Sequence, residues 1–304
     1  MTEEPLISVV IATRDRPQLL AEAIKAVLCQ RYAGPIEVLV VFDQAELDGR
    51  LVRDDKFRNV QVMKNQRTPG LAGARNTGCD AASGAFLAFC DDDDVWLPEK
   101  LNEQIAALSL APDAVAVVCG VIIMYETRRV IRIPRGNNLT LEALLDRRVA
   151  AAHPSTVLVT RRALAAIGPV DEAIPGSYGE DYDWILRCAE LGPIAVVELP
   201  LVRVRWGAGS YFSDRWQTMA DAIAYLVEKH PEFDQSPRGL SRLWGRQAFA
   251  LAAAGSRGPA RAAAKASIAL SWREPRGYLA YAVSWRLISA AALMRMANRR
   301  GRGI

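Results

Sequence analysis

The sequence lacks several features that would place it in a specialised class. Its five cysteines are far apart and form no CxxC pair, so neither a disulfide framework nor a zinc site is indicated, and a reducing, cytoplasmic location is expected. The absence of a GxGxxG loop disfavours a dinucleotide-binding dehydrogenase. No uninterrupted apolar run reaches the roughly 20 residues that a membrane-spanning helix needs, and the N-terminus, MTEEPLISVV, is not typical of a signal peptide.

The sequence also has little excess of positive over negative charge. The formal net charge is only +4 for 304 residues, so we expect no nucleic-acid partner, although the stretch Arg295–Arg302 is basic. The apolar content of 51% is sufficient for a sizeable core in one large domain or two smaller ones.

Strand and helix patterns alternate through most of the chain. This alternation predicts an α/β fold with a mostly parallel sheet flanked by helices, whose ligand crevice lies outside the carboxyl ends of the strands. Beyond about Trp216 the pattern is helical and rich in alanine, which predicts a domain 1–212 and a helical C-terminal region 213–304. The predicted strands are 6–11, 36–42, 59–63, 86–90, 114–124, 156–160, 194–199 and 201–204, and the predicted helices include 17–30, 73–82 and 182–191.

Four consecutive aspartates, Asp91–Asp94, follow the strand that ends at Cys90. Adjacent ionised carboxylates raise one another's pKa and destabilise a fold unless a positive charge joins them. Their position after a strand and before Trp96 favours a site for a divalent cation, and carboxylate oxygens suit Mg²⁺ or Mn²⁺. The alternative is a solvated acidic loop in which Asp94 caps the next helix.

Two loops offer partners for this cluster. In TPGLAGARNTG, Arg75 lies on a helix that leads to the acidic strand, where its planar guanidinium suits carboxylates or a diphosphate. In IATRDRP, backbone groups at Ala12 and Arg14 follow the first strand, and Asp43 follows the second. These strand ends should share one crevice and could bind a nucleotide base. Structural pairing of Arg75 and a turn role for Asp43 are the alternatives.

Five segments in order resemble the motifs of family 2 glycosyltransferases with the GT-A fold. They lie within residues 6–205 and are ISVVIATRDRP, EVLVVFD, GLAGARNTG, AFLAFCDDDDVWLPEKL and GEDYDWILRCAELG. The resemblance implies a Rossmann-like sheet and metal-dependent, inverting transfer of a sugar from a nucleotide sugar, UDP- or dTDP-linked, to an acceptor hydroxyl. It also implies a place in the synthesis of cell-surface polysaccharide or glycoconjugate.

The resemblance implies roles for particular residues as well. Asp91 and Asp93 match the two acids of the metal-binding motif, and Arg75 would approach the diphosphate. Asp181, beside Glu180, matches the general base that removes the proton of the acceptor hydroxyl. An acidic helix N-terminus, stabilised by the helix dipole, is the alternative for these two carboxylates. The remaining donor contacts would come from Ala12, Thr13, Arg14, Asp43 and Asp92.

Two positions depart from the family pattern. Phe42 stands where the family often has an acid before Asp43, and Gly207 stands where it often has a histidine. A non-catalytic module that binds sugar nucleotides is therefore kept as an alternative. A second alternative is a nucleotidyltransferase, which also joins a parallel sheet to a metal-bound nucleotide and would release pyrophosphate.

The C-terminal segment predicts a further contact. Apolar and aromatic residues at positions 278, 281, 285, 288 and 292 follow the spacing of one helix, and the basic stretch Arg295–Arg302 follows them. Such a helix could lie peripherally on the inner face of the cell membrane, cover the catalytic domain or pair two protomers in a homodimer. The acceptor would then be a saccharide or a lipid-linked sugar.

Overall fold

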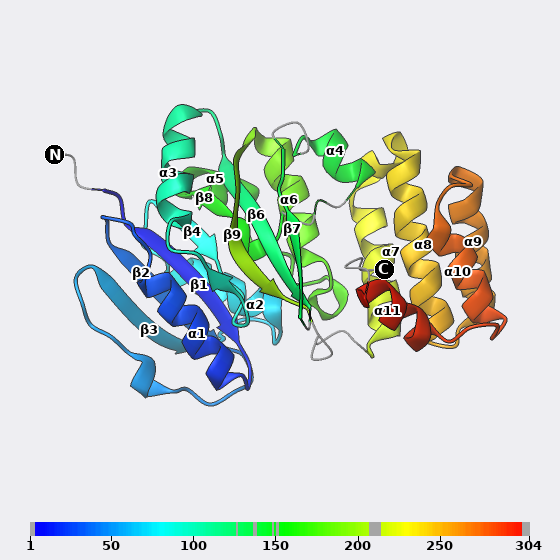
Figure 1. Cartoon of the computed structure of the whole chain (residues 1–304), viewed down its shortest axis with the longest axis horizontal. Coiled ribbons are helices and arrows are strands. Elements are labelled where there is room, and N and C mark those ends of the chain that lie inside the picture. The colour runs from blue at the N-terminus through cyan, green and yellow to red at the C-terminus, as the bar shows by residue number, and fades with distance from the viewer. Residues whose placement is uncertain are drawn as a thin grey trace.

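The computed structural model describes residues 4–125, 127–135, 139–147, 149, 152–206 and 214–299, which form a sheet flanked by helices and a C-terminal group of helices (Figure 1). The strands are β1 (Ile7–Thr13), β2 (Ile36–Phe42), β3 (Arg58–Lys64), β4 (Phe86–Phe89), β5 (Val95–Trp96), β6 (Ala116–Tyr125), β7 (Arg128–Arg132), β8 (Leu158–Thr160) and β9 (Ile194–Arg205). The helices between them are α1 (Pro17–Leu28), α2 (Leu71–Ala81), α3 (Lys100–Leu110), α4 (Leu141–Asp146), α5 (Arg161–Ile167) and α6 (Glu180–Leu191), with short 3-10 helices at η1 (Gly49–Leu51), η3 (Pro154–Thr156) and η4 (Pro175–Ser177).

The strands of the described residues form a nine-stranded sheet. Its order is β3-β2-β1-β4-β8-β6-β9-β5, and β7 pairs with β6. Strands β1, β2, β3, β4, β6 and β9 run in one direction, whereas β5, β7 and β8 run in the other. The predicted mostly parallel α/β sheet is therefore confirmed.

The two faces of the sheet carry separate apolar cores, because successive side chains of a strand point to opposite faces. On β1, Val9 packs in the cluster that includes Leu20 and Ile24 of α1. Its neighbour Val10 packs in the other cluster, with Ala74 of α2. Burial on both faces explains why β2 reads IEVLVVF, an almost continuous apolar run.

Several predicted elements need correction. The strands expected at 194–199 and 201–204 are one strand, β9, whose register against β6 shifts around Gly120. Thr156, expected in a strand, belongs to η3, and the prediction contained neither the exposed strand β7 nor the short strand β5. These elements are too short, or too polar, to give a clear periodic signal.

The C-terminal region is helical, as expected. It contains α7 (Trp216–Lys229), η5 (Pro231–Gln235), α8 (Pro237–Ala253), α9 (Arg257–Leu270), α10 (Pro275–Ser284) and α11 (Ala290–Arg299). No helix within the described ranges combines the length and the apolar character needed to cross a membrane. The expected domain boundary near residue 212, Gly207 and the basic residues after Arg299 lie outside the described residues.

The single helix expected through positions 278–292 is wrong. Helix α10 ends at Ser284, and Arg286 adopts a left-handed conformation with φ 60°. The backbone N–H groups of Arg286 and Leu287 bond back to the carbonyls of Val283 and Ala282 at 2.9 Å each. This pair of bonds is the Schellman motif, which ends a helix whatever the apolar spacing beyond it.

Asp183 of α6 joins the sheet region to the C-terminal helices. Its buried carboxylate lies 2.6 Å from Lys229 Nζ and 2.9 Å from His230 Nε2, and Arg187 of its own helix pairs with it at 2.8 Å. Burial alone would oppose ionisation, but the hydrogen bonds from His230 and Lys229 hold the pKa of Asp183 below its usual range. The carboxylate is therefore a charged anchor between α6 and the end of α7.

Replacing Asp183 by Asn should lower the free energy of unfolding at pH 7 by about 3 kcal/mol, because Lys229 and Arg187 lose their buried counter-charge. The pKa of Asp183 is lower in the folded state than in the unfolded chain. The decrease in the free energy of unfolding should therefore have its full size above about pH 4 and become smaller on further acidification. Urea unfolding across this pH range measures the effect. Asp171→Asn, which removes another Lys229 partner in a more exposed position, is the control and should cost less. A difference that stays constant down to low pH would contradict the charge argument.

Candidate active site

The predicted strand ends do meet at one edge of the sheet. Thr13 ends β1 opposite Phe42 of β2, and β4, which precedes the aspartates, pairs with β1 on its other side. The backbone N–H of Asp43 donates to the carbonyl of Thr13 at 2.9 Å. The common edge expected from the α/β pattern is therefore confirmed.

Two of the aspartates are contacted by the last residue of β1 and by the loop that follows it. Thr13 Oγ1 donates to Asp92 at 2.8 Å, and Arg16 Nη1 lies 3.2 Å from Asp92 and 2.9 Å from Asp93. Burial, with the charges of Asp91 and Asp92, nevertheless raises the pKa of Asp93 to about 6. The loop thus compensates only part of the negative charge.

Arg75 connects the acidic turn to helix α6. Its guanidinium is buried, lies 2.5 Å from Asp91 Oδ1 and forms an ion pair with Glu180. Burial disfavours its charge, but Glu180 and Asp91 outweigh burial and raise the pKa of Arg75. Burial raises the pKa of Glu180 to about 7, and the positive charge of Arg75 opposes that shift. Of the two partners that the sequence left open for Arg75, the structure shows the acidic cluster, and contact with a diphosphate stays a prediction.

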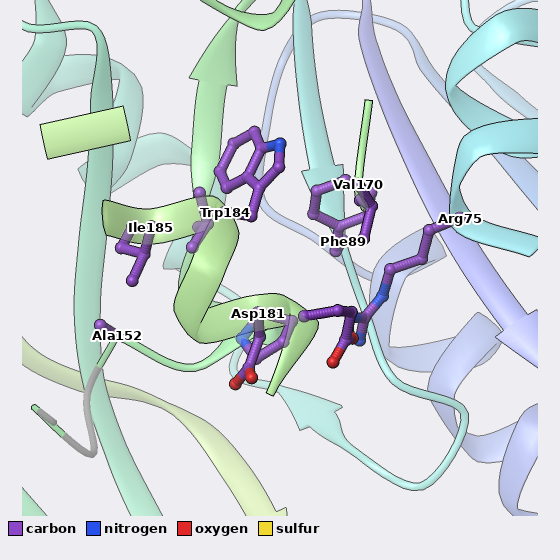
Figure 2. Close-up of a pocket in the computed structure, with 10 residues that line it drawn as sticks. Arg75, Phe89, Ala152, Val170, Asp181, Trp184 and Ile185 are labelled. Carbon is purple, nitrogen blue, oxygen red and sulfur yellow. The ribbon is translucent and has the colours of Figure 1, made fainter. Parts of the chain in front are cut away.

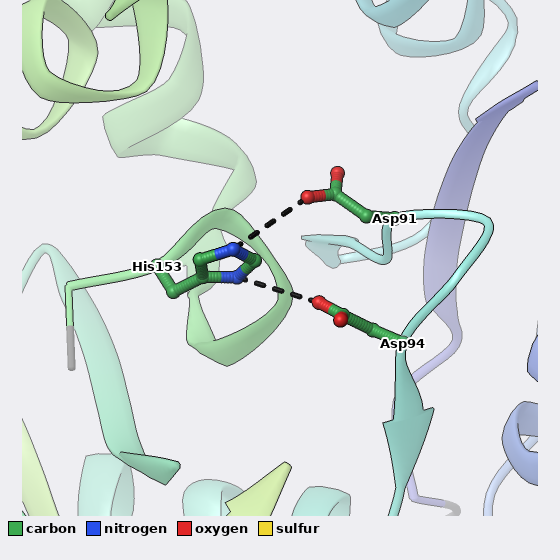
Figure 3. A group of neighbouring side chains, drawn as sticks. All are labelled: Asp91, Asp94 and His153. Carbon is green, nitrogen blue, oxygen red and sulfur yellow. Dashed lines mark ion pairs between the residues drawn. The ribbon is translucent and has the colours of Figure 1, made fainter. Parts of the chain in front are cut away.

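Asp94 lies in a different environment, beside His153 (Figure 3). One ring nitrogen of His153, Nδ1, is 3.4 Å from Asp94, and the other, Nε2, is 3.8 Å from Asp91. Ser155 Oγ donates to Asp94 at 2.6 Å and accepts the backbone N–H of Asp91 at 2.9 Å, which holds the turn in place. Ligand atoms of Asp91, Asp94 and His153 lie within 4.8 Å of one another. Two carboxylates and one imidazole are a donor set that fits a divalent ion such as Mn²⁺.

The other predicted donor-binding residues have varied surroundings. Asp43 is buried, and its Oδ1 accepts from Asn65 Nδ2 at 2.9 Å and from the backbone N–H of Gly70 at 3.0 Å, so it orders the loop before α2. Arg14 is exposed and lies 3.9 Å from Asp15, while Ala12 is half-buried in β1. Contact of these residues with a nucleotide stays a prediction.

Asp181 lies in the first turn of α6 and borders a small pocket (Figure 2). Helix α6 begins after Gly179, whose φ of 84° favours glycine, and this turn directs Glu180 toward Arg75. Asp181 itself is half-buried. The pocket is lined by Arg75, Phe89, Ala152, Pro154, Val157, Val170, Glu180, Asp181, Trp184 and Ile185.

The sequence assigned no role in the site to Arg16, Ser155 or His153, and for Asp94 it offered only a place in the acidic cluster or a helix cap. Arg16 could have been found, because it lies in the same short loop as Arg14 and is the third charged residue of TRDR. His153 and Ser155 reach the aspartates only because β8 pairs antiparallel with β4. That pairing joins segments about seventy residues apart and leaves no local signal.

Comparison with known proteins identifies the family. The family model described as Glycosyl transferase family 2 matches residues 8–168, which is more than half of the chain. The chain belongs to glycosyl transferase family 2.

This family 2 chain is 34% identical over 107 residues to the UDP-Glc:alpha-D-GlcNAc-diphosphoundecaprenol beta-1,3-glucosyltransferase WfgD of Escherichia coli, a match that covers 35% of this chain and 42% of WfgD. It is 30% identical over 154 residues to the succinoglycan biosynthesis protein ExoO of Rhizobium meliloti, covering 48% of this chain and 43% of ExoO. The chain thus spans less than half of these relatives.

Solved structures share the fold of this family 2 chain. S. aureus TarS 1-349 in complex with UDP-GlcNAc superposes with a TM-score of 0.57 at 15% identity, covering 97% of this chain and 92% of that one. The mannosyltransferase PcManGT from Pyrobaculum calidifontis, in complex with GDP-Man and Mn²⁺, has a TM-score of 0.57 at 20% identity and covers 96% and 87%. At these identities the likeness establishes the GT-A-type fold.

Asp94→Asn should stabilise the metal-free protein at pH 7. Burial and the charge of Asp91 raise the pKa of Asp94 well above its usual value, so the ionised carboxylate destabilises the folded state. Removing it should add on the order of 1–2 kcal/mol to the free energy of unfolding, and the gain should vanish below about pH 4, where the carboxyl is protonated in both states. Urea unfolding with excess chelator measures this, with the exposed Asp113→Asn as the matched control. A loss of stability at pH 7 would show that the Ser155 hydrogen bond outweighs the repulsion.

Proposed function

We propose that the protein is a metal-dependent, inverting glycosyltransferase that moves a sugar from a nucleotide diphosphate sugar to an acceptor hydroxyl. The observation that carries the proposal is the bridge made by Arg75, which contacts Asp91 of the acidic turn and Glu180 beside Asp181. This bridge would hold the proposed metal and diphosphate site close to the proposed base. Transfer with inversion needs such an arrangement, because leaving group and base act on opposite sides of the reacting carbon.

The donor we propose is UDP-linked, with a dTDP-linked sugar as the next choice. WfgD uses UDP-Glc by its name, and TarS was solved with UDP-GlcNAc, which supports UDP, whereas PcManGT was solved with GDP-Man. For the acceptor we propose a saccharide or lipid-linked sugar of cell-surface polysaccharide synthesis. The names of WfgD, a diphosphoundecaprenol glucosyltransferase, and ExoO, a succinoglycan biosynthesis protein, support it.

The proposed cofactor is Mg²⁺ or Mn²⁺, with Asp91 as a ligand. Asp93, the second acid matched by sequence, faces Arg16, while Asp94 and His153 face Asp91. The ion would therefore be held by Asp91 with Asp93 or with the Asp94–His153 pair. When bound, such an ion neutralises charge that develops on the leaving diphosphate.

The proposed base is Asp181, which would take the proton of the acceptor hydroxyl. Glu180 is committed to Arg75 in the structure, so its proposed part is to position Asp181 and the guanidinium. Arg75, Thr13 and Asp92 would contact the donor, together with Ala12, Arg14 and Asp43. In this proposal residues 1–212 form the catalytic domain and 213–304 the helical extension.

Calorimetric titration with UDP, dTDP and GDP, each with Mn²⁺ and again with excess chelator, tests the donor. We expect metal-dependent binding of UDP, because the carboxylates repel a bare diphosphate until a cation joins them. Release of pyrophosphate from a nucleoside triphosphate would instead favour a nucleotidyltransferase. Binding without turnover on a broad acceptor panel would favour a non-catalytic module.

Asp181→Asn should keep metal-dependent donor binding and lower kcat by roughly 10²–10⁴-fold, the usual contribution of a general base. Product formation from a radiolabelled nucleotide sugar measures kcat, and calorimetry on the same variant measures donor binding. Asp113→Asn removes an exposed acid outside the acidic cluster and should leave both unchanged. Normal turnover by Asp181→Asn would refute the base assignment.

Single substitutions separate the two proposed ligand sets. If Asp93 is a ligand, Asp93→Asn should weaken Mn²⁺-dependent nucleotide binding about tenfold or more, whereas His153→Ala should do so if the Asp94–His153 pair holds the ion. Asp91→Asn should weaken binding in either case. The measurement is the Mn²⁺ concentration that gives half-maximal nucleotide binding. Unchanged Mn²⁺ dependence in all three variants would remove the metal from this turn.

A further inference from the structure

The C-terminal part of the sequence carries a concentration of positive charge. Residues 257–304 contain ten lysine and arginine residues and one acidic residue, Glu274, a net charge of +9, whereas residues 1–256 carry −5. Glu274 is itself paired with Arg276 at 2.7 Å. The modest total charge therefore hides a strong separation, and the positive part attracts anionic surfaces.

The same helices expose large aromatic side chains. Among the described residues, the exposed Trp and Tyr side chains are Trp272 (70%), Tyr278 (49%) and Trp285 (61%). Trp285 caps the C-terminal end of α10, seven residues or about two helical turns after Tyr278, so the two residues lie on the same side. Tyr278 Oη donates to the carbonyl of Trp272 at 3.0 Å. Leu287, two residues after Trp285, is 79% exposed. We call Trp272, Tyr278, Trp285 and Leu287 the aromatic face.

Each tryptophan of the aromatic face is paired with an arginine. The guanidinium of Arg261 lies 3.7 Å from the ring centre of Trp285, and that of Arg273 lies 4.9 Å from the ring centre of Trp272. Such cation–π pairs present an apolar ring and a positive charge side by side. This combination suits the head-group level of a bilayer, where aromatic rings partition and arginine binds phosphate.

We propose that the aromatic face docks on the surface of an anionic lipid bilayer. Each basic residue close to an anionic leaflet adds attraction, and the exposed rings add apolar burial at the interface. A second copy of the chain fits less well, because a two-fold interface would place this +9 region against itself. Helices α9 and α10 lie at the opposite end of the molecule from β3 (Figure 1).

Vesicle flotation with the full chain tests this. The protein should float with phosphatidylcholine vesicles that contain about 30% phosphatidylglycerol and should not float with phosphatidylcholine alone. Raising the salt from about 0.1 M to about 0.5 M should weaken the binding, because the Debye length shortens.

The Trp272→Ser, Trp285→Ser double variant should lower the partition coefficient about tenfold or more, since two large apolar groups are lost. Leu110→Ser is the matched control, because Leu110 is also strongly exposed (88%) but lies on α3 and should not contact the bilayer. Thermal unfolding verifies that both variants fold.

Three outcomes would overturn the proposal. The unmodified protein could fail to float with anionic vesicles, or the double variant could float as well as the unmodified protein. In the third outcome the unmodified protein does not bind vesicles, but the double variant differs from it in oligomeric state or in binding of a soluble polyanion. A change of oligomeric state would assign the face to a second copy of the chain, and a change in polyanion binding would assign it to a polymer. Vesicle binding is measured without turnover, so a failed transferase assay leaves this result standing, and the reverse is also true.

Discussion

The buried guanidinium of Arg75 is the interaction on which the geometry of the site depends. A buried arginine keeps its charge and needs carboxylates beside it, and Asp91 of the acidic turn and Glu180 of α6 supply them. Helix α2 can bring Arg75 there because it packs closely on β1. A Cβ at Gly78 would lie 2.4 Å from a β1 side chain, so only glycine allows this approach. The distance between the acidic turn and the start of α6 follows from these contacts.

Electrostatic repulsion in the acidic turn shapes its surroundings. Thr13 and Arg16 approach Asp92 and Asp93 from the β1 loop, and Ser155 supports Asp94 from the segment before β8. Even so, burial raises the pKa of the last three aspartates above the usual range. A cluster that is only partly compensated costs stability, and natural proteins keep such costs mainly where a site needs them. The cation in our proposed mechanism would complete the compensation.

The local sequence pattern predicted the long strands and helices, but it did not predict the short or exposed strands. Strands β1, β2 and β6 were identified by their apolar runs, and helices α1 and α6 by the spacing of their apolar residues. The two-residue strand β5 and the exposed strand β7 carry no such period. The apolar spacing after residue 278 predicted one helix, but the backbone bonds at Arg286 end it, because a local hydrogen-bonding motif outweighs a weak periodic signal.

The sequence by itself determined the α/β class and the shared edge that carries Thr13, Asp43 and the aspartates, and it left Arg75 open between the aspartates and a diphosphate. These features depend on local spacing and on the rule that parallel strands end at one edge. Only the tertiary structure decided which partner each carboxylate has. His153 reaches Asp91 and Asp94 through the pairing of β8 with β4, and the aromatic face forms because α9 and α10 fold against each other. Such contacts join distant segments through packing, and no short stretch of sequence encodes packing on its own.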